Sequence, residues 1–533
     1  MKRIAPVVLA SILALLLAAC GSAASHTSTS SPASTSTNEA KGEEPLVLIV
    51  VGFAGDANGS DAISYRSDYN WHDLAFTSDK GVSAYYNNQS NGDFTWTPAH
   101  ETSAFEVDGN TCAADTADDG IVHVTLPRGH GHWFKQEEVS DTMSTTSGTY
   151  TYDASNDQLS SNDADFNACM LEALKAADAY VDFSSYDKNK DGALEKNELG
   201  VGLIVAGYDI DGPWMTLLDD NEYPRMQAHA NAFSSDSASS QNIIILDDTV
   251  VMGESIISVP VAHEDDLTVD PSLIQVTPNS LSTLTHELGH YLGLADYYDT
   301  SYNSEAAWAD WTPGPLSVMD TGAVLPVTNS EGRHEYVASS FDPFSLIDLS
   351  WLTADTVNAS GTYELRAAGA AGGKNVLRVN TNTQGEYFLI ENRQATGQDA
   401  GLASYYENEP VGGIVVWHVD ENQYKKAQED NEVNLPVHRP SLTVQYLLAK
   451  TGPDTTIHTL NFAESIEPDT LTAFWTASNA QKRFAELGTD SFELWTYGPG
   501  TKADNTKDRR YCGIKLRFPD ESADTMHVEI ELP

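Results

Sequence analysis

The stretch TLTHELGHYLGLADYYD, Thr283–Asp299, constrains this 533-residue chain more than any other. Its apolar spacing predicts a helix over 281–292, and on such a helix, which turns about 100° per residue, four apolar side chains fall within roughly 80° of one another. Those four are Leu281, Leu284, Leu288 and Tyr291. His286 and His290 lie about 40° apart on the opposite side. One face of the helix is therefore expected to enter a core while the other presents two imidazoles.

Two imidazoles one helical turn apart have the spacing of two ligands of one tetrahedral zinc ion. Glu287 lies beside His286 and is placed to take the proton of a zinc-activated water. Gly293 suits a helix end, and a sharp turn there would return Asp296 to the metal as the third ligand. The fourth position would stay open for water, as catalytic zinc sites require. An amphipathic helix that carries histidines without a metal is the alternative.

Two further segments bear on the ligand set. Glu305 could be the third ligand in a thermolysin-like arrangement, but Asp310 follows it by five residues where such motifs expect four, so Asp296 is preferred. The segment LSVMDTG, Leu316–Gly322, resembles a Met-turn, the methionine-bearing loop beneath the metal in metzincins. Met319 would be its methionine, and a plain core methionine is the alternative.

The pattern HExxHxxGxxD followed by SVMD resembles the immune inhibitor A family of bacterial zinc metallopeptidases. Weaker likeness extends over roughly residues 45–533, through stretches such as GVSAYYNNQSNGDF, EYFLIENRQ and GGIVVWHVDEN. The resemblance implies a metzincin-like α/β (α+β) catalytic domain followed by a mostly β C-terminal region. It implies zinc endopeptidase activity on protein or peptide substrates, with Glu287 as catalytic base. The implied zinc ligands are His286, His290 and Asp296.

The chain departs from the family in two respects. Members often carry a propeptide, whereas only a short tether precedes the first expected strand here. No tyrosine stands two residues after Met319, where some metzincins place a group that stabilises the transition state. Tyr302, His334 and Tyr336 remain open for that role.

The N-terminus predicts export. Residues 1–20 have a basic start and an apolar run that is short for a membrane span, and they end in LAAC, which resembles a bacterial lipobox. Lipid would then be attached to Cys20, and an ordinary signal peptide is the alternative. Residues 21–44 are Ser/Thr-rich and predict a flexible tether. We expect a protein anchored to the cell envelope through this lipid alone, or released outside the cell.

The net charge argues against nucleic acid as a partner, and the cysteine content bears on disulfide bonds. The chain holds 29 Lys and Arg against 78 Asp and Glu, a net charge of −49, which would repel nucleic acid. Beyond Cys20 there are three cysteines, and we expect Cys112 to pair with Cys169 and to leave Cys512 free.

Hydrophobic patterning predicts two regions. Helical and strand-like runs alternate through about residue 300, as in the helix-like DFNACMLEALKAADAYV and the buried-strand pattern GVGLIVAG, so residues 45–344 are expected to form the catalytic domain. Residues 345–533 carry short strand-like runs broken by Gly, Pro, Asn and Asp, and are expected to be mostly β within the same unit.

The segment DKNKDGALEKNE, Asp187–Glu198, fits the twelve-residue calcium loop. Side-chain ligands at positions 1, 3, 5, 9 and 12 would be Asp187, Asn189, Asp191, Glu195 and Glu198. Gly192 would make the turn and Ala193 would offer its carbonyl. The strand pattern that follows favours a structural calcium over a helix-loop-helix sensor, and an acidic turn without metal is the alternative.

Two rival functions use the same residues. A zinc hydrolase could act on a cell-wall amide, or a binding protein could keep the scaffold without catalysis. The second rival does not need Glu287, whose presence therefore favours an enzyme.

We expect calcium to stabilise this protein through Asp187–Glu198. Four carboxylates repel one another until a cation binds, and binding to the folded loop alone would add about 2.7 kcal/mol at a hundredfold excess over the dissociation constant. Thermal unfolding of wild type and Asp191→Ala across a calcium titration checks this. Identical calcium-dependent shifts in the two proteins would mean that the loop is not the site.

Overall fold

The computed structural model contains both helices and sheets, which confirms an α+β class. The structure describes residues 39–53, 70–101, 106–107, 110–111, 118–126, 141–145, 148–152, 163–194, 197–206, 208–209, 225–226, 229–231, 244–247, 249–251, 256–261, 280–298, 300, 312–328, 334–406, 411–428, 433–434, 441–445, 473–497 and 509–533.

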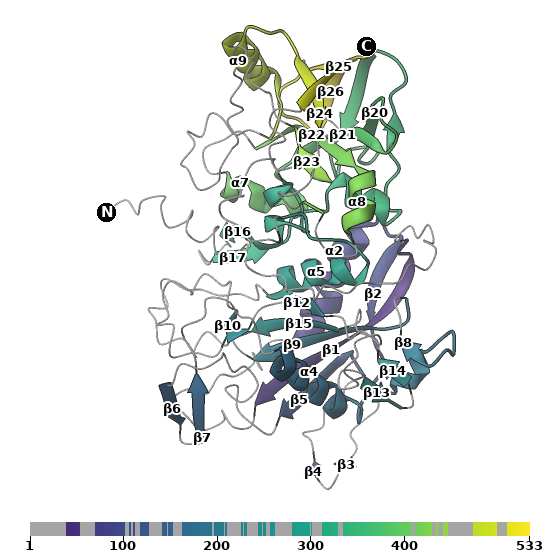
Figure 1. The fold of residues 1–533 in the computed structure, drawn as a ribbon, viewed down its shortest axis with the longest axis vertical. Coiled ribbons are helices and arrows are strands. Elements are labelled where there is room, and N and C mark those ends of the chain that lie inside the picture. Colours follow the sequence, from purple (N-terminus) through teal and green to yellow (C-terminus); the bar gives the residue numbers. More distant parts are fainter. Residues whose placement is uncertain are drawn as a thin grey trace.

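A largely parallel sheet forms the N-terminal half of the molecule, in the lower part of Figure 1. Its path is β12 (His229–Asn231), β15 (Ile256–Val261), β9 (Gly200–Ala206), β1 (Gly42–Phe53) and β2 (Phe94–Pro98), with β5 (Ile121–Leu126) also on β1. The long strand β1 pairs with β2 through its first part and with β5 through its second, and β9 lies along its other edge. Only the edge strand β12 is antiparallel.

Both faces of this sheet are covered, which explains the unbroken apolar run of β1. Successive side chains of a strand point to opposite faces. Leu48 and Val50 enter a core with α2 (Val82–Gln89) and α5 (Ser280–Tyr291). Val47 and Ile49 enter a second core with α4 (Asp163–Ala177). The helix predicted over 281–292 is therefore present as α5, and it lies on one face of the sheet.

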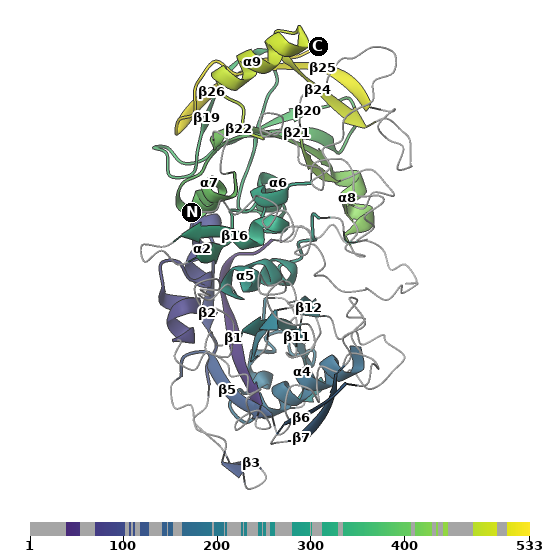
Figure 2. The same cartoon turned by 90° about the vertical axis from the view of Figure 1, so that its left-hand side faces the viewer.

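Two stacked sheets form the C-terminal part, at the top of Figures 1 and 2. The inner sheet has the order β18 (Asp355–Thr356), β20 (Val376–Asn380), β21 (Glu386–Gln394), β22 (Gly412–Asp420) and β23 (Leu442–Val444). The outer sheet has the order β19 (Gly361–Arg366), β26 (Thr525–Glu531), β25 (Arg509–Arg517) and β24 (Phe492–Tyr497). The helices of this part are α7 (Gly401–Tyr405), α8 (Glu421–Ala427) and α9 (Ala477–Leu487).

The inner sheet shares its core with α5. Leu389 of β21 and Trp417 of β22 belong to the same buried cluster as Leu284 and Leu288 of the helix. The residues that alternate with them along the strands, such as Ile390, point to the other face of the inner sheet and pack against the outer sheet in a separate cluster. Helix α5 thus lies between the large sheet and the C-terminal sheets, as both views show (Figures 1 and 2).

The remaining elements are short. They are a π-helix (Asp73–Thr77), α6 (Pro343–Asp348), 3₁₀ turns at Phe183–Tyr186, Gly314–Leu316, Thr321–Val324 and Gly397–Ala400, and the strands β3 (Glu106–Val107), β4 (Asn110–Thr111), β6 (Asp141–Thr145), β7 (Gly148–Tyr152), β8 (Ala193–Leu194), β10 (Tyr208–Asp209), β11 (Arg225–Met226), β13 (Ile244–Leu246), β14 (Thr249–Val251), β16 (Leu325–Thr328) and β17 (His334–Val337). Among the described residues, no helix has the length and apolar character needed to cross a membrane.

The cysteine prediction needs correction. Cys169 is a free thiol on α4 that is buried in the core between this helix and the large sheet, so the predicted pair with Cys112 is wrong. Cys512 is free, as predicted. Cys112, the signal segment with Cys20, and residues 21–38 of the tether lie outside the described residues.

Because one core joins α5 to the inner sheet, we expect Leu284→Ala and Leu389→Ala to lower the temperature of the same unfolding transition. Each removes a fully buried leucine, which typically costs about 2 to 5 kcal/mol. Calorimetry of both variants checks this. Two separate transitions, each moved by only one of the substitutions, would contradict a shared core.

Candidate metal centre

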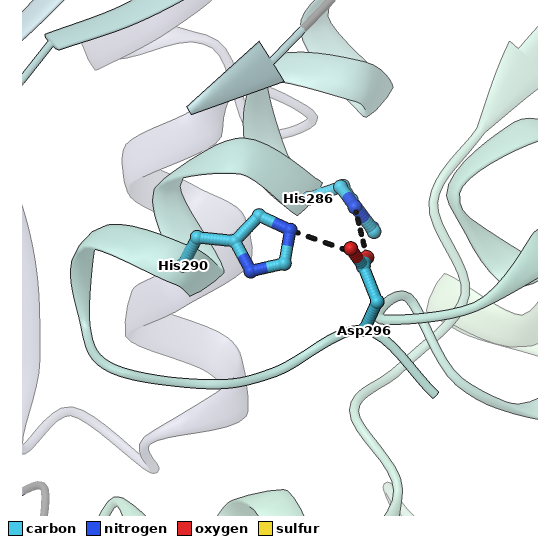
Figure 3. Close-up of side chains that lie close together, drawn as sticks. All are labelled: His286, His290 and Asp296. Carbon is cyan, nitrogen blue, oxygen red and sulfur yellow. Dashed lines mark ion pairs between the residues drawn. The ribbon is translucent and has the colours of Figure 1, made fainter. Parts of the chain in front are cut away.

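Helix α5 brings the two predicted histidines together. Its apolar side is buried through Leu284, Leu288 and Tyr291, and the imidazoles of His286 and His290 lie with their ring centroids 4.8 Å apart. Figure 3 shows both rings on the same side of the helix.

Backbone carbonyls fix the orientation of each ring. The carbonyl oxygen of Val318 lies 2.6 Å from Nδ1 of His286, and that of Leu294 lies 2.9 Å from Nδ1 of His290. An acceptor at Nδ1 holds the proton of a neutral imidazole there and leaves Nε2 with its lone pair. Both Nε2 atoms are thereby prepared to bind a cation.

A tight turn then brings Asp296 back to the helix. Gly293 has φ of +96°, and the amides of Gly293 and Leu294 donate to the carbonyls of His290 and Gly289. This left-handed position suits glycine because a side chain would be strained there. Oδ1 of the fully buried Asp296 lies 3.1 Å from Nε2 of His286 and 3.2 Å from Nε2 of His290 (Figure 3).

The buried carboxylate controls the charge of this group. Burial lowers the pKa of both histidines, but the neighbouring Asp296 outweighs it, raising the pKa of His286 and raising that of His290 to about 9. Burial raises the pKa of Asp296, and the two histidines overcome this and hold it well below its usual range. The metal-free site therefore keeps a carboxylate beside protonated imidazole.

These three residues fit a metal ion. One ligand atom from each lies within 4.8 Å of the others, and two imidazole nitrogens with one carboxylate oxygen are a donor set used by catalytic zinc and other transition metals. Among the described residues, no other group of three or more His, Cys, Asp or Glu converges in this way. The donor set does not by itself select one metal.

Glu287 is buried close to this group without belonging to it. Its side chain is 2% exposed, and its negative charge contributes to the raised pKa values of both His286 and His290. A carboxylate held near two metal-ligating imidazoles, but outside the ligand set, is available for proton transfer.

The Met319 segment lies directly against the helix. A Cβ added to Gly289 would lie 2.4 Å from Sδ of Met319, so this close packing needs glycine. The carbonyl of Met319 accepts the amide of Tyr297, next to Asp296, at 2.8 Å. The preceding Val318 carbonyl is the partner of His286. Sequence reasoning placed Met319 beneath the metal but missed Val318, because a backbone carbonyl leaves no residue pattern.

Most of the other candidate residues are not tested by the structure. Glu305, Tyr302 and Asp310 lie outside the described residues, as does the side chain of His334. Tyr336 is partly buried on β17, and burial raises its pKa.

The predicted calcium loop is a folded turn followed by β9 rather than by a helix. Asp187 accepts the amides of Lys190, Asp191 and Gly192, and Glu198 accepts the amides of Lys188 and Asn189. Glu195 lies outside the described residues. The backbone of Ala193 lies in β8, and its amide donates to Asp191. Calcium binding by this loop stays a prediction.

The loop also has a hydrogen-bond connection to helix α5. The buried Glu44 carboxylate of β1 accepts the amide of Asn197 at 2.8 Å and the hydroxyl of Tyr291. Tyr291 directly follows His290. The calcium-loop segment is therefore connected to the candidate metal centre, although the two are far apart in the sequence.

No protein-family model matches the chain, and a search of curated proteins finds no significant match.

The raised pKa values of the two histidines predict that the stability of the metal-free protein falls as the pH rises, whereas its affinity for metal increases. In the metal-free protein, the raised pKa of His290 contributes stability that is fully present below about pH 6.5, the ordinary histidine value, and is lost as the pH rises through about 9. Metal must displace these protons, so its affinity should rise with pH towards 9 by about tenfold per pH unit for each proton displaced. Competition with a chelator between pH 6 and 9 measures the affinity. A metal affinity that does not change with pH would contradict protonation of the histidines in the metal-free site.

Proposed function

We propose that this protein is an exported zinc-dependent endopeptidase that hydrolyses peptide bonds of extracellular proteins. The observation that carries the proposal is the convergence of His286, His290 and Asp296, with Glu287 buried beside them on the same helix. A structural metal site would fill its coordination with protein ligands, whereas three ligands leave a position for a reacting molecule.

The ligands are held by their neighbours before any metal binds. Val318 and Leu294 fix the imidazole rings through Nδ1, and the Gly293 turn fixes the carboxylate. Zinc bound here would supply the Lewis acid that activates water and polarises the amide carbonyl. Glu287 would take the proton of the attacking water and pass it to the leaving amine.

The resemblance of this motif and of Met319 to the immune inhibitor A family supports a metzincin-like catalytic domain. Packing of Met319 against Gly289 is consistent with a Met-turn role. The lipobox-like LAAC ending at Cys20 supports export with a lipid anchor to the bacterial envelope. Protein or peptide substrates are proposed on the same grounds.

We expect Glu287→Gln to retain zinc while losing most peptidase activity. The amide is nearly isosteric with the carboxylate but cannot accept the proton of water, and loss of a general base costs about 100- to 10,000-fold. Activity on casein and metal content are measured on the same preparation. A Gln variant with bound zinc and near-normal turnover would contradict the mechanism.

Digestion of casein and of peptidoglycan by the wild type separates the rivals. Release of cell-wall fragments without casein cleavage would favour the amidase alternative. Zinc binding with neither activity would favour a binding protein.

A further inference from the structure

Arg393 of β21 is a buried cation that connects the inner C-terminal sheet to segments near the candidate metal centre. Its side chain is 2% exposed. Nε and Nη2 donate to the two carboxylate oxygens of Asp399 at 3.0 and 2.8 Å, and Glu391 lies 3.6 Å from Nη1. Although burial lowers the pKa of Arg393, these carboxylates raise it above its ordinary value, so the guanidinium stays charged.

The remaining donors of this guanidinium reach into the neighbouring segments. Nη1 donates to the carbonyl of Leu316 at 2.6 Å, and Nη2 donates to that of Ser340 at 3.2 Å. Asp399, fixed by the same arginine, also accepts the amide of Ser340 at 2.8 Å. Arg393 therefore hydrogen-bonds to two separate segments of the backbone, at Leu316 and at Ser340.

Leu316 lies two residues before Val318, whose carbonyl holds Nδ1 of His286. The intervening Ser317 donates its hydroxyl to Asp342, and its oxygen accepts the amide of Met319 at 3.2 Å. The segment Leu316–Met319 is thus fixed at its start by Arg393, and it presents its far end to the histidine and to Gly289.

We propose that Arg393 is a positioning residue for the metal centre, which sets the orientation of His286 through the Leu316–Val318 backbone. This rests on the metal site of the proposed function but not on the peptidase reaction. It gives the C-terminal sheet an indirect part in metal binding, through the backbone that holds His286, beyond its share of the hydrophobic core.

A planar guanidinium is suited to this position because it serves two oxygens of Asp399 and two carbonyls at once. Lysine keeps the charge but cannot reproduce this fork of donors. Removal of a partner that orients a metal ligand typically lowers metal affinity by about 10- to 100-fold.

The test compares Arg393→Lys and Arg393→Met with Leu516→Ala as a control of stability. Leu516 is fully buried between the two C-terminal sheets, in a cluster separate from α5. Zinc affinity is measured by chelator competition on the full chain, and amide hydrogen exchange of Leu316–Met319 is measured on the metal-free proteins.

We expect both arginine variants to lose zinc affinity by about 10- to 100-fold and to exchange faster over Leu316–Met319. We expect Leu516→Ala to keep both properties at a comparable loss of thermal stability. Should Arg393→Met fail to fold, Arg393→Lys, which keeps the buried charge, decides alone.

Wild-type affinity and exchange in a folded arginine variant would overturn the proposal, as would equal losses in Leu516→Ala. A wild type that binds zinc without cleaving protein would overturn the peptidase assignment and leave this role of Arg393 intact.

Discussion

The buried carboxylate of Asp296 is the group on which this part of the structure depends. A carboxylate removed from water is costly unless a cation or several hydrogen bonds compensate it. Here the compensation comes from His286 and His290, whose Nε2 atoms lie 3.1 and 3.2 Å away. A metal ion with the same three ligands would replace the protons of the imidazoles, so the site is stable in either state and its occupancy is linked to pH.

The surrounding fold limits how far these groups can move. The large sheet carries α5 on one face, the inner C-terminal sheet packs against the same core, and the segment Leu316–Met319 lies between them against the helix. The packing of Gly289 on Met319 and the carbonyl of Val318 fix the helix and one ring. The pre-organised site is thus a product of residues from both halves of the chain.

Much of this arrangement follows from sequence patterns. The apolar period predicted α5 within one residue at each end, and the HExxHxxGxxD spacing identified the three groups that converge. Contacts made through backbone carbonyls, such as those of Val318 and Leu316, have no such signature, so the contact of Arg393 with this segment could not be predicted. The predicted disulfide was wrong because cysteine number and spacing do not reveal that Cys169 packs as a free thiol in a hydrophobic core.

Metal content of the purified full chain tests the central claim most directly. Elemental analysis after exposure to zinc and removal of free metal should find one zinc per wild-type chain and a marked loss in Asp296→Ala. Glu305→Ala should retain the metal, since Asp296 is the carboxylate that reaches both imidazoles. Full zinc content in Asp296→Ala together with its loss in Glu305→Ala would contradict the ligand set and favour a thermolysin-like site.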